Sequence, residues 1–469
     1  MEENLKYLKD YLFNPSSVAV IGASEKQGSL GRAIMENLLA KYKGKIYAVN
    51  IRGDTVFGLP VYRSILDVPD NVDLAVIIIP AKFVPDVVDQ CGKKGVKATV
   101  IISAGFKEIG ESGAKLEEKT VEIARKYGIR ILGPNCLGIY NTSSGLDLIF
   151  NPNDRQDKPP AGNVAFLSQS GALGAACLDY FANNQIGLSS FVSYGNAADI
   201  DESELVEYFG YDEKTKVISM YVEGLKDGRK FVNIAKKITS RKPIVILKAG
   251  KTQAGSRAAK SHTGALSGDI ALYNAAFKQI GIIQAASMED LFVKIKALSM
   301  QRPAKGNRVC ILTNGGGAGV LATDATEHNG LVLASLQDET ISQLKSVLPE
   351  SASPYNPVDI LGDAPTERYT NAFDILKKDP GIDAIVVIIL PQSPAVKHDE
   401  LVDELSKRIS QCEKPVTVAV PGGRIAQYLI KRFIESKIPA FSSPEDAVLG
   451  IQALVEFGNI QKKLGGKNV

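Results

Sequence analysis

The segment Val18-Ala-Val-Ile-Gly22-Ala-Ser-Glu-Lys-Gln-Gly28-Ser-Leu-Gly31-Arg32 decides the fold of this chain. It joins a short apolar run to the start of an expected helix through a glycine-rich turn. Glycines let a backbone come close to phosphate groups, and a helix N-terminus supplies free N–H groups and positive potential. The turn is longer than the G-x-G-x-x-G pattern requires. Two interpretations therefore stay open, a phosphate-binding turn and a turn that only connects strand to helix.

Short apolar runs alternate with longer helix-like segments along the whole chain. Many of the runs are apolar without alternation, as is typical of strands that are covered on both faces. Strand and helix in alternation predict an α/β fold with parallel sheets. The runs expected to be strands are 18–21, 46–49, 74–79, 99–102, 130–132, 164–167, 217–222, 243–247, 309–312, 384–390 and 415–420.

Two polar stretches that contain proline, 151–162 and 301–307, indicate linkers. They predict three domains, 1–150, 163–300 and 308–469. The second and third domains open alike, since each begins with an apolar run that leads into a glycine-containing turn and a helix. The similarity predicts two analogous helix starts that accept anions.

Composition excludes several classes of function. The chain has 469 residues, 45% hydrophobic and 23% charged, which suits a soluble protein of several domains. The net charge of +3 argues against a nucleic-acid or membrane surface. No apolar run approaches the ~20 residues of a membrane span, and the N-terminus lacks the order of a signal peptide. Five scattered cysteines form no C-x-x-C pair, so we expect no metal site, no disulfide framework and a cytoplasmic location.

The end of the second expected strand indicates the ligand of the first domain. An NAD site carries a carboxylate there, whereas this chain has Asn50-Ile-Arg52. A guanidinium suits a phosphate on the ribose, which predicts CoA, with its 3′-phosphate, or NADP. The alternative is that Arg52 pairs with Asp54 or Asp67.

Later strand ends face the same crevice of a doubly wound sheet. These are Pro80, after the third strand, and Ser103-Ala104, after the fourth. The turn Gly133-Pro-Asn-Cys136 closes the domain, and its alternative interpretation is a plain turn with a buried small thiol.

His262 lies in the segment from Ala249 to Gly268, among small residues and scattered cations. It is one of three histidines in the chain. A neutral imidazole is a nucleophile that can accept a phosphoryl group and pass it on. The 20 residues of the segment, at most ~3.3–3.6 Å each when extended, allow a swing of about 20–30 Å. The alternative is an incidental histidine in a glycine-containing loop.

Together these segments resemble the acyl-CoA synthetase (NDP-forming) superfamily, which includes succinyl-CoA synthetase. The resemblance is strongest to the α subunits of archaeal ADP-forming acetyl-CoA synthetases, and it covers essentially the whole chain. Its most specific parts are Gly133-Pro-Asn-Cys136, Ser168-Gln-Ser-Gly171 and Ser261-His-Thr-Gly-Ala-Leu-Ser-Gly268. The implied reaction is acyl-CoA + ADP + phosphate ⇌ acid + CoA + ATP, through an acyl phosphate and a phosphohistidine.

The resemblance also implies roles for single residues. His262 would accept the phosphoryl group, and Glu223 would hydrogen-bond its ring. Ser170 and Gly171 match the helix start that binds the phosphohistidine, and Gly316 and Gly317 match a second such start. Asn135 and Cys136 fall where the CoA thiol meets the acyl group, with no chemistry assigned to Cys136. The residues that match CoA-contacting segments are Gly22, Ala23, Ser24, Lys26, Gly28, Asn50, Arg52, Pro80, Ser103 and Ala104.

The implied architecture is an N-terminal Rossmann-like CoA-binding domain followed by two flavodoxin-like domains with doubly wound parallel sheets. The chain has no room for an ATP-grasp domain, so we expect an ATP-grasp β subunit in an α₂β₂ assembly. ADP or ATP, with Mg²⁺, would bind on that partner. No visible residue distinguishes acetate from larger acids, and ADP or GDP would be chosen by the partner. Two other classes stay open, an NADP-dependent oxidoreductase and a non-catalytic CoA-sensing protein of the same fold.

Overall fold

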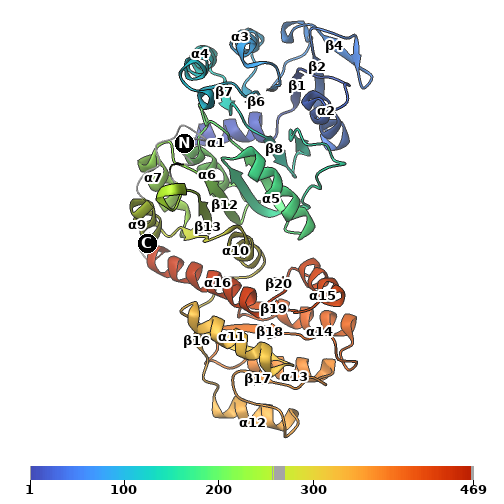
Figure 1. Cartoon of the computed structure of the whole chain (residues 1–469), viewed down its shortest axis with the longest axis vertical. Coiled ribbons are helices and arrows are strands. Elements are labelled where there is room, and N and C mark those ends of the chain that lie inside the picture. Colours follow the sequence, from blue (N-terminus) through green and yellow to red (C-terminus); the bar gives the residue numbers. More distant parts are fainter. Residues whose placement is uncertain (1, 256, 258–269, 466–469) are drawn as a thin grey trace. The chain divides into compact units, whose positions relative to one another are not determined.

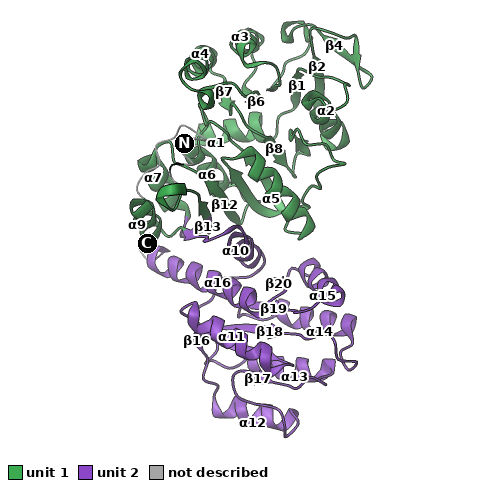
Figure 2. Ribbon diagram, viewed as in Figure 1, with its two compact units in different colours: residues 1–238, 246–282 green, residues 239–245, 283–469 purple. Residues whose placement is uncertain are grey.

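The computed structural model describes residues 2–255, 257 and 270–465 (Figure 1). The chain divides into two compact units (Figure 2). Unit 1 comprises Met1–Ile238 and Ile246–Ile282, and unit 2 comprises Thr239–Val245 and Ile283–Val469. Among the described residues, no helix is both long enough and apolar enough to cross a membrane.

The first sheet of unit 1 has seven strands in the order β3-β4-β2-β1-β5-β6-β7. Its strands are β1 (Ser17–Ile21), β2 (Lys45–Val49), β3 (Thr55–Val56), β4 (Leu59–Tyr62), β5 (Leu74–Ile77), β6 (Ala98–Ile101) and β7 (Arg130–Leu132). Its helices and short turns are α1 (Glu2–Tyr7), η1 (Leu8–Phe13), α2 (Leu30–Lys41), η2 (Ile65–Asp67), η3 (Ala81–Phe83), α3 (Val84–Lys94), η4 (Lys107–Ile109) and α4 (Glu111–Tyr127).

The centre of this sheet is parallel and fully buried. Val18 of β1 lies opposite Ile46 of β2 on one side and Leu74 of β5 on the other. All five residues of β1 are buried, as unalternating apolar runs predict for a strand covered on both faces. Apolar residues of α3 and α4, among them Val88 and Val121, pack into the same core.

The second sheet has seven strands, of which those described here for unit 1 run in the order β13-β12-β10-β11-β8-β9. Its strands are β8 (Gly138–Asn141), β9 (Leu146–Asp147), β10 (Ala161–Ser168), β11 (Leu188–Ser193), β12 (Val217–Val222) and β13 (Ile244–Lys248). The helices are α5 (Gly171–Asn183), α6 (Glu202–Tyr211), α7 (Gly228–Ile238) and α9 (Ile270–Ile280). β10 pairs in parallel with β11 and β12, whereas β8 is antiparallel to β11.

Unit 2 contains a parallel sheet in the order β16-β15-β18-β19-β20, with β17 also paired to β15. The strands of this sheet are β15 (Arg308–Thr313), β16 (Val332–Leu333), β17 (Val358–Asp359), β18 (Ala384–Ile388), β19 (Val416–Ala419) and β20 (Ala440–Phe441), and β14 (Ile283–Gln284) of unit 2 is not part of it. Its helices are α10 (Met288–Met300), α11 (Gly316–His328), α12 (Asp338–Val347), α13 (Thr366–Leu376), α14 (His398–Ser410), α15 (Arg424–Glu435) and α16 (Pro444–Gly465).

The structure confirms the mixed α/β class and each strand expected from an apolar run. The stretch 151–162, expected as a linker, ends in the first two residues of β10 and contains a packed residue. Gln156 is buried and donates to Ala175 O at 2.5 Å. The division of the chain into three domains stays a prediction. The two compact units divide at other residues, near 239–245 and 283.

Candidate active site

Two neighbouring cavities in unit 1 lie at the carboxyl ends of the strands of the first sheet. One has a volume of about 810 Å³ and the other of about 1000 Å³. Gly22, Ile78, Ile79 and Pro80 line both, so the cavities meet where β1 and β5 end. Ligands of open α/β sheets bind in such crevices.

Most of the residues expected to contact CoA line one cavity or the other. The 1000 Å³ cavity is also lined by Ala23, Ser24, Lys26, Asn50 and Arg52. The 810 Å³ cavity is also lined by Ser103, Ala104, Asn135, Cys136, Ser170, Gly171 and Glu223. Gly28 lines neither cavity, and its exposed position with φ +76° explains a glycine there through backbone conformation alone.

The turn between β1 and α2 requires its glycines because backbones approach closely. Gly22 has φ +103°, and a Cβ on it would lie 2.5 Å from Ile78 O. A Cβ on Gly31 would lie 2.1 Å from Gly22 O. Ser29 caps α2 by accepting a hydrogen bond from Arg32 N at 3.3 Å. The first turn of α2 is thereby brought against the end of β1 at the wall of the 810 Å³ cavity.

Asn50 joins the backbone of two segments that were expected to contact CoA. Its side-chain amide donates to Ala23 O at 2.8 Å, and its Oδ1 accepts from Arg52 N at 3.0 Å. The carboxylates that could have paired with Arg52 bond elsewhere. Asp54 accepts from Arg63 at 3.1 Å, and Asp67 accepts from Ser64 N at 2.9 Å.

Several lining residues of the 1000 Å³ cavity were not expected from the sequence, among them Arg63, Phe83 and Gln90. Arg63 donates to Ile51 O at 2.7 Å, which places a second guanidinium beside Arg52. Phe83 keeps half of its surface exposed. No motif marks these residues, because they reach the cavity from different elements after β4 and β5.

Ser103 joins the ends of β5 and β6 to the turn that follows β7. Its hydroxyl donates to Ile79 O at 2.5 Å and accepts from Ile79 N at 3.2 Å. Its carbonyl accepts from Asn135 N at 3.0 Å. Asn135 has φ +57°, in the left-handed region that asparagine tolerates better than most residues. The predicted neighbours Ser103 and Asn135 are thus brought together in one wall.

Cys136 is a buried thiol. It is 4% exposed and lies 3.4 Å from Ile101 O, to which its Sγ donates. Burial raises the pKa of Cys136 to about 12, despite hydrogen bonds from nearby backbone N–H groups. A thiol with so high a pKa is not a nucleophile near neutral pH. Cys136 therefore shapes the cavity wall.

Asn196 is a wall residue that sequence reasoning missed. Its side-chain amide donates to Glu108 at 2.7 Å and to Glu117 at 2.8 Å. Burial raises the pKa of Glu117. Burial also acts to raise the pKa of Glu108, but hydrogen bonds from Asn196 and from three backbone N–H groups outweigh it and lower the pKa. Asn196 also donates its backbone N–H to Pro134 O at 3.0 Å, so it braces the Asn135 turn.

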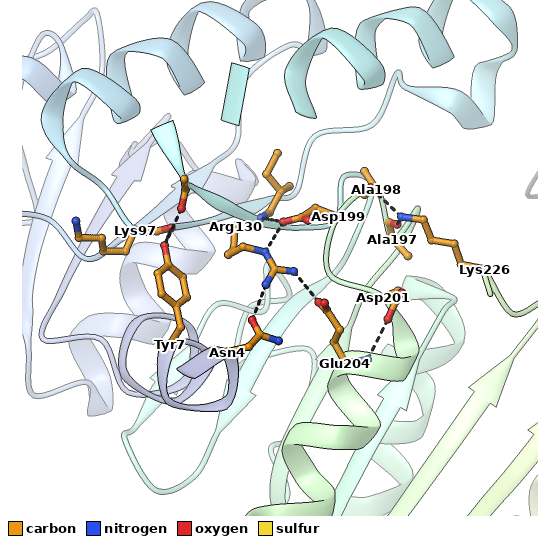
Figure 3. A network of polar contacts seen from close by, with 12 residues as sticks. Asn4, Tyr7, Lys97, Arg130, Ala197, Ala198, Asp199, Asp201, Glu204 and Lys226 are labelled. Atoms are coloured by element: carbon orange, nitrogen blue, oxygen red, sulfur yellow. Dashed lines mark hydrogen bonds and ion pairs between the residues drawn. The ribbon is translucent and has the colours of Figure 1, made fainter. Parts of the chain in front are cut away.

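A polar network holds the segment that follows Asn196 (Figure 3). Arg130 of β7 donates to Asp199 at 2.8 Å, to Glu204 at 2.6 Å and to Asn4 at 2.8 Å. Lys226 donates to the carbonyls of Ala197 and Ala198. The segment is therefore fixed on both sides, which keeps Asn196 in place against the cavity.

The N-terminus of α5 opens into the 810 Å³ cavity. Ser170 caps the helix, because its hydroxyl accepts from Leu173 N at 3.3 Å, and Gly171 is the first helical residue. The first N–H groups of a helix have no partner within it and favour an anion. The helix start that the sequence placed at Ser170 and Gly171 is therefore present, and its role as a phosphate site stays a prediction.

Glu223 lies directly after β12 and is 7% exposed. Its backbone N–H and that of Gly224 both donate to Oε1 of Gln169, at 2.8 and 3.1 Å. The Tyr221 hydroxyl lies 3.5 Å from Glu223 Oε1. Burial raises the pKa of Tyr221 to about 12, so it stays a neutral donor. A carboxylate and a helix N-terminus therefore share one cavity.

The remaining predicted residues do not line this cavity or lie outside the described residues. His262 and most of its segment lie outside the described residues, although residues 253–255, expected as loop, are helical. Gly316 and Gly317 begin α11 in unit 2, where a Cβ on Gly316 would lie 3.1 Å from Asp359 Oδ2.

Family models match three stretches of this chain. A family model described as a CoA binding domain matches residues 16–142. A model described as a succinyl-CoA ligase like flavodoxin domain matches residues 161–298, and a ligase-CoA domain matches residues 309–456.

Relatives match over nearly the whole chain. The α subunit of ADP-forming acetate–CoA ligase II from Pyrococcus furiosus is 42% identical, over 97% of this chain and 99% of that protein. ADP-forming acetate–CoA ligase I from Archaeoglobus fulgidus is 44% identical over 96% of this chain, which spans 64% of that protein. A solved structure of dinucleotide-forming acetyl-coenzyme A synthetase 1 from Ca. Korarchaeum cryptofilum, in complex with phosphate and ADP, has a TM-score of 0.92 at 40% identity, covering 98% of this chain and 99% of that one. This chain belongs to the family of ADP-forming acetate–CoA ligase α subunits.

Proposed function

We propose that this chain is the α subunit of an ADP-forming acyl-CoA synthetase that acts on acetyl-CoA or a related acyl-CoA. It converts acyl-CoA, ADP and phosphate to acid, CoA and ATP. One observation carries the proposal. The 810 Å³ cavity joins the strand ends expected to hold CoA, the N-terminus of α5 and the carboxylate of Glu223.

The first step uses the part of the cavity between Asn135 and Ser170. A phosphate oxygen attacks the thioester carbonyl carbon, the C–S bond breaks, and CoA leaves as thiolate. The product is an acyl phosphate. The α5 N-terminus stabilises the phosphate charge by about 0.3–1 kcal/mol when exposed and up to ~2 kcal/mol when partly buried. Each N–H bond to a charged acceptor adds about 1.5–3 kcal/mol.

The second step moves the phosphoryl group to His262. A ring nitrogen attacks phosphorus, the bond to the acyl oxygen breaks, and the acid leaves as carboxylate. Glu223 accepts the N–H of the other ring nitrogen, which fixes the tautomer and stabilises the cationic ring. The position of Glu223, buried in the same cavity as Ser170 and Gly171, supports this role.

The third step delivers the phosphoryl group to ADP on a partner. The Archaeoglobus fulgidus relative extends beyond the part that this chain matches, since the chain spans 64% of it, and this supports a further part on a partner. We infer an ATP-grasp β subunit that carries ADP and Mg²⁺, an α₂β₂ assembly and a cytoplasmic location. Gly316 and Gly317 form the second helix start for the phosphate, and the segment around His262 carries the phosphoryl group between the two places.

An NADP-dependent oxidoreductase would leave the α5 N-terminus and Glu223 without a role. A CoA-sensing protein would have no need of a phosphoryl acceptor. Labelled phosphate separates these alternatives from a synthetase, because only a synthetase forms a phosphorylated protein.

The test is labelling of the chain by γ-labelled ATP in the presence of its partner. The wild-type chain should carry an acid-labile, base-stable label, and His262→Asn should carry none. Equal labelling of the two proteins would remove His262 from the mechanism.

A further inference from the structure

Lys248 is a buried cation at the end of β13, next to Glu223. The residue is 4% exposed, and its ammonium donates to Glu223 O at 2.8 Å and to Ala249 O at 2.5 Å. A buried ammonium is costly unless its donors are satisfied. Burial lowers the pKa of Lys248, and the nearby Glu223 carboxylate acts in the opposite direction.

Tyr273 of α9 completes the surroundings of this cation. The Lys248 ammonium lies 4.9 Å from the centre of the Tyr273 ring, a distance at which a cation is attracted to an aromatic face. The Tyr273 hydroxyl accepts a hydrogen bond from Leu225 N at 3.2 Å. One tyrosine therefore contacts both the cation and the backbone two residues after Glu223.

Side chains from three different elements thus hold the backbone of residues 223–225. Gln169, just before α5, accepts from the N–H groups of Glu223 and Gly224. Lys248 donates to the carbonyl of Glu223, and Tyr273 accepts from Leu225 N. Because the backbone groups of Glu223 are bonded on both sides, these contacts restrain the direction of its Cα–Cβ bond.

We propose that Lys248 and Tyr273 are positioning residues, which hold Glu223 so that its carboxylate is aimed at the imidazole it serves. The proposal rests on the proposed function, since it takes Glu223 as the partner of the phosphoryl acceptor. In the proposed reaction, neither residue contacts the reacting atoms. Lys248 acts through the carbonyl and the charge of Glu223, and Tyr273 acts through the cation and through Leu225 N.

The test compares Lys248→Met with a matched control, Lys296→Met. Lys296 of α10 is also buried, donates to the carbonyl of Ala440 at 3.2 Å and lies 5.0 Å from the Phe441 ring centre, but it belongs to unit 2. In the chain assembled with its partner, Lys248→Met should lower kcat by about 100-fold, the cost of a misplaced catalytic group. KM for CoA should not change, and Lys296→Met should leave kcat unchanged.

A double-mutant cycle with Glu223→Gln separates positioning from a structural role. If Lys248 acts through Glu223, Lys248→Met costs less than about threefold in kcat once Glu223→Gln is present, because coupled residues are not additive. Tyr273→Phe, which keeps the ring, should lose less activity than Tyr273→Leu. Equal kcat for Lys248→Met and wild type, or an undiminished loss in the Glu223→Gln background, would overturn the proposal. A wild-type chain that takes no label from ATP would overturn the proposed function instead.

Discussion

The side-chain amide of Asn196 donates a hydrogen bond to Glu108 Oε2 at 2.7 Å. The same amide also donates to Glu117, so two carboxylates share one neutral donor of the cavity wall. Asn196→Asp replaces that donor with a third carboxylate. We expect a loss of about 1–3 kcal/mol in the free energy of unfolding and a higher KM for CoA, measured by urea denaturation and by steady-state kinetics. Wild-type stability in this variant would show that the contacts are dispensable.

Gly31 allows α2 to approach the end of β1, where a Cβ would lie 2.1 Å from Gly22 O. Gly31→Ala should therefore move the helix start, lower Tm and weaken CoA binding in calorimetry. Gly317→Ala is the matched control, because it is also the second residue of its helix and a Cβ there meets nothing within 4 Å. Alanine at Gly317 should keep or raise Tm, because helix propensity favours alanine over glycine by up to about 1 kcal/mol. Equal Tm values for the two variants would contradict the close approach.

We expect the Cys136 thiol to be unreactive in the folded protein. Burial raises its pKa to about 12, and all five cysteines of the chain are buried and free. A thiol reagent at pH 8 should label the folded protein far more slowly than the unfolded chain. Cys136→Ala should keep kcat within about threefold, because a small wall residue loses little packing and no chemistry. Rapid labelling with parallel loss of activity would assign the thiol a role in the reaction.

The burial of Lys296 predicts that the free energy of unfolding depends on pH. Burial lowers its pKa from 10.5 to about 8, while Asp446 acts in the opposite direction. Between pH 8 and 10.5 the unfolded chain holds a proton that the folded chain has released, so this group makes stability rise with pH across that window. Below pH 8 both states are protonated, and the cost of burying the charge is fully present.

Lys296→Met removes this cost. At pH 7 the variant should be more stable than wild type by up to about 3 kcal/mol, and the difference should shrink as pH rises toward 10.5. Thermal melts of both proteins at pH 7, 8.5 and 10 measure it. A constant difference at all three pH values would show that packing, and not titration, separates the two proteins.

Most strands, and the residues expected to contact CoA, could be predicted from the sequence for a physical reason. Strands covered on both faces leave unbroken apolar runs, and their carboxyl ends meet at one edge of a sheet. Asn50, Ser103 and Asn135 could be placed at that edge from their positions after such runs. Ser170 could be placed because the glycine after it starts a helix.

Other features of the structure could not be predicted from the pattern of apolar runs. β11 was missed because its serines interrupt the apolar run, although all six of its residues are buried. Asn196 and Lys248 act through residues distant in the sequence, Glu108 and Tyr273 among them. Contacts of this kind depend on how the sheets and helices pack, and a single sequence does not reveal them.

The most direct measurement starts from acyl-CoA and labelled inorganic phosphate, without nucleotide, using this chain with its partner. A relay through the protein predicts that label appears on the chain in acid-labile form and that it moves to ATP when ADP is added. In His262→Asn and Glu223→Gln the label should be absent or form far more slowly. Labelled ATP that forms while the chain never carries label would contradict the relay.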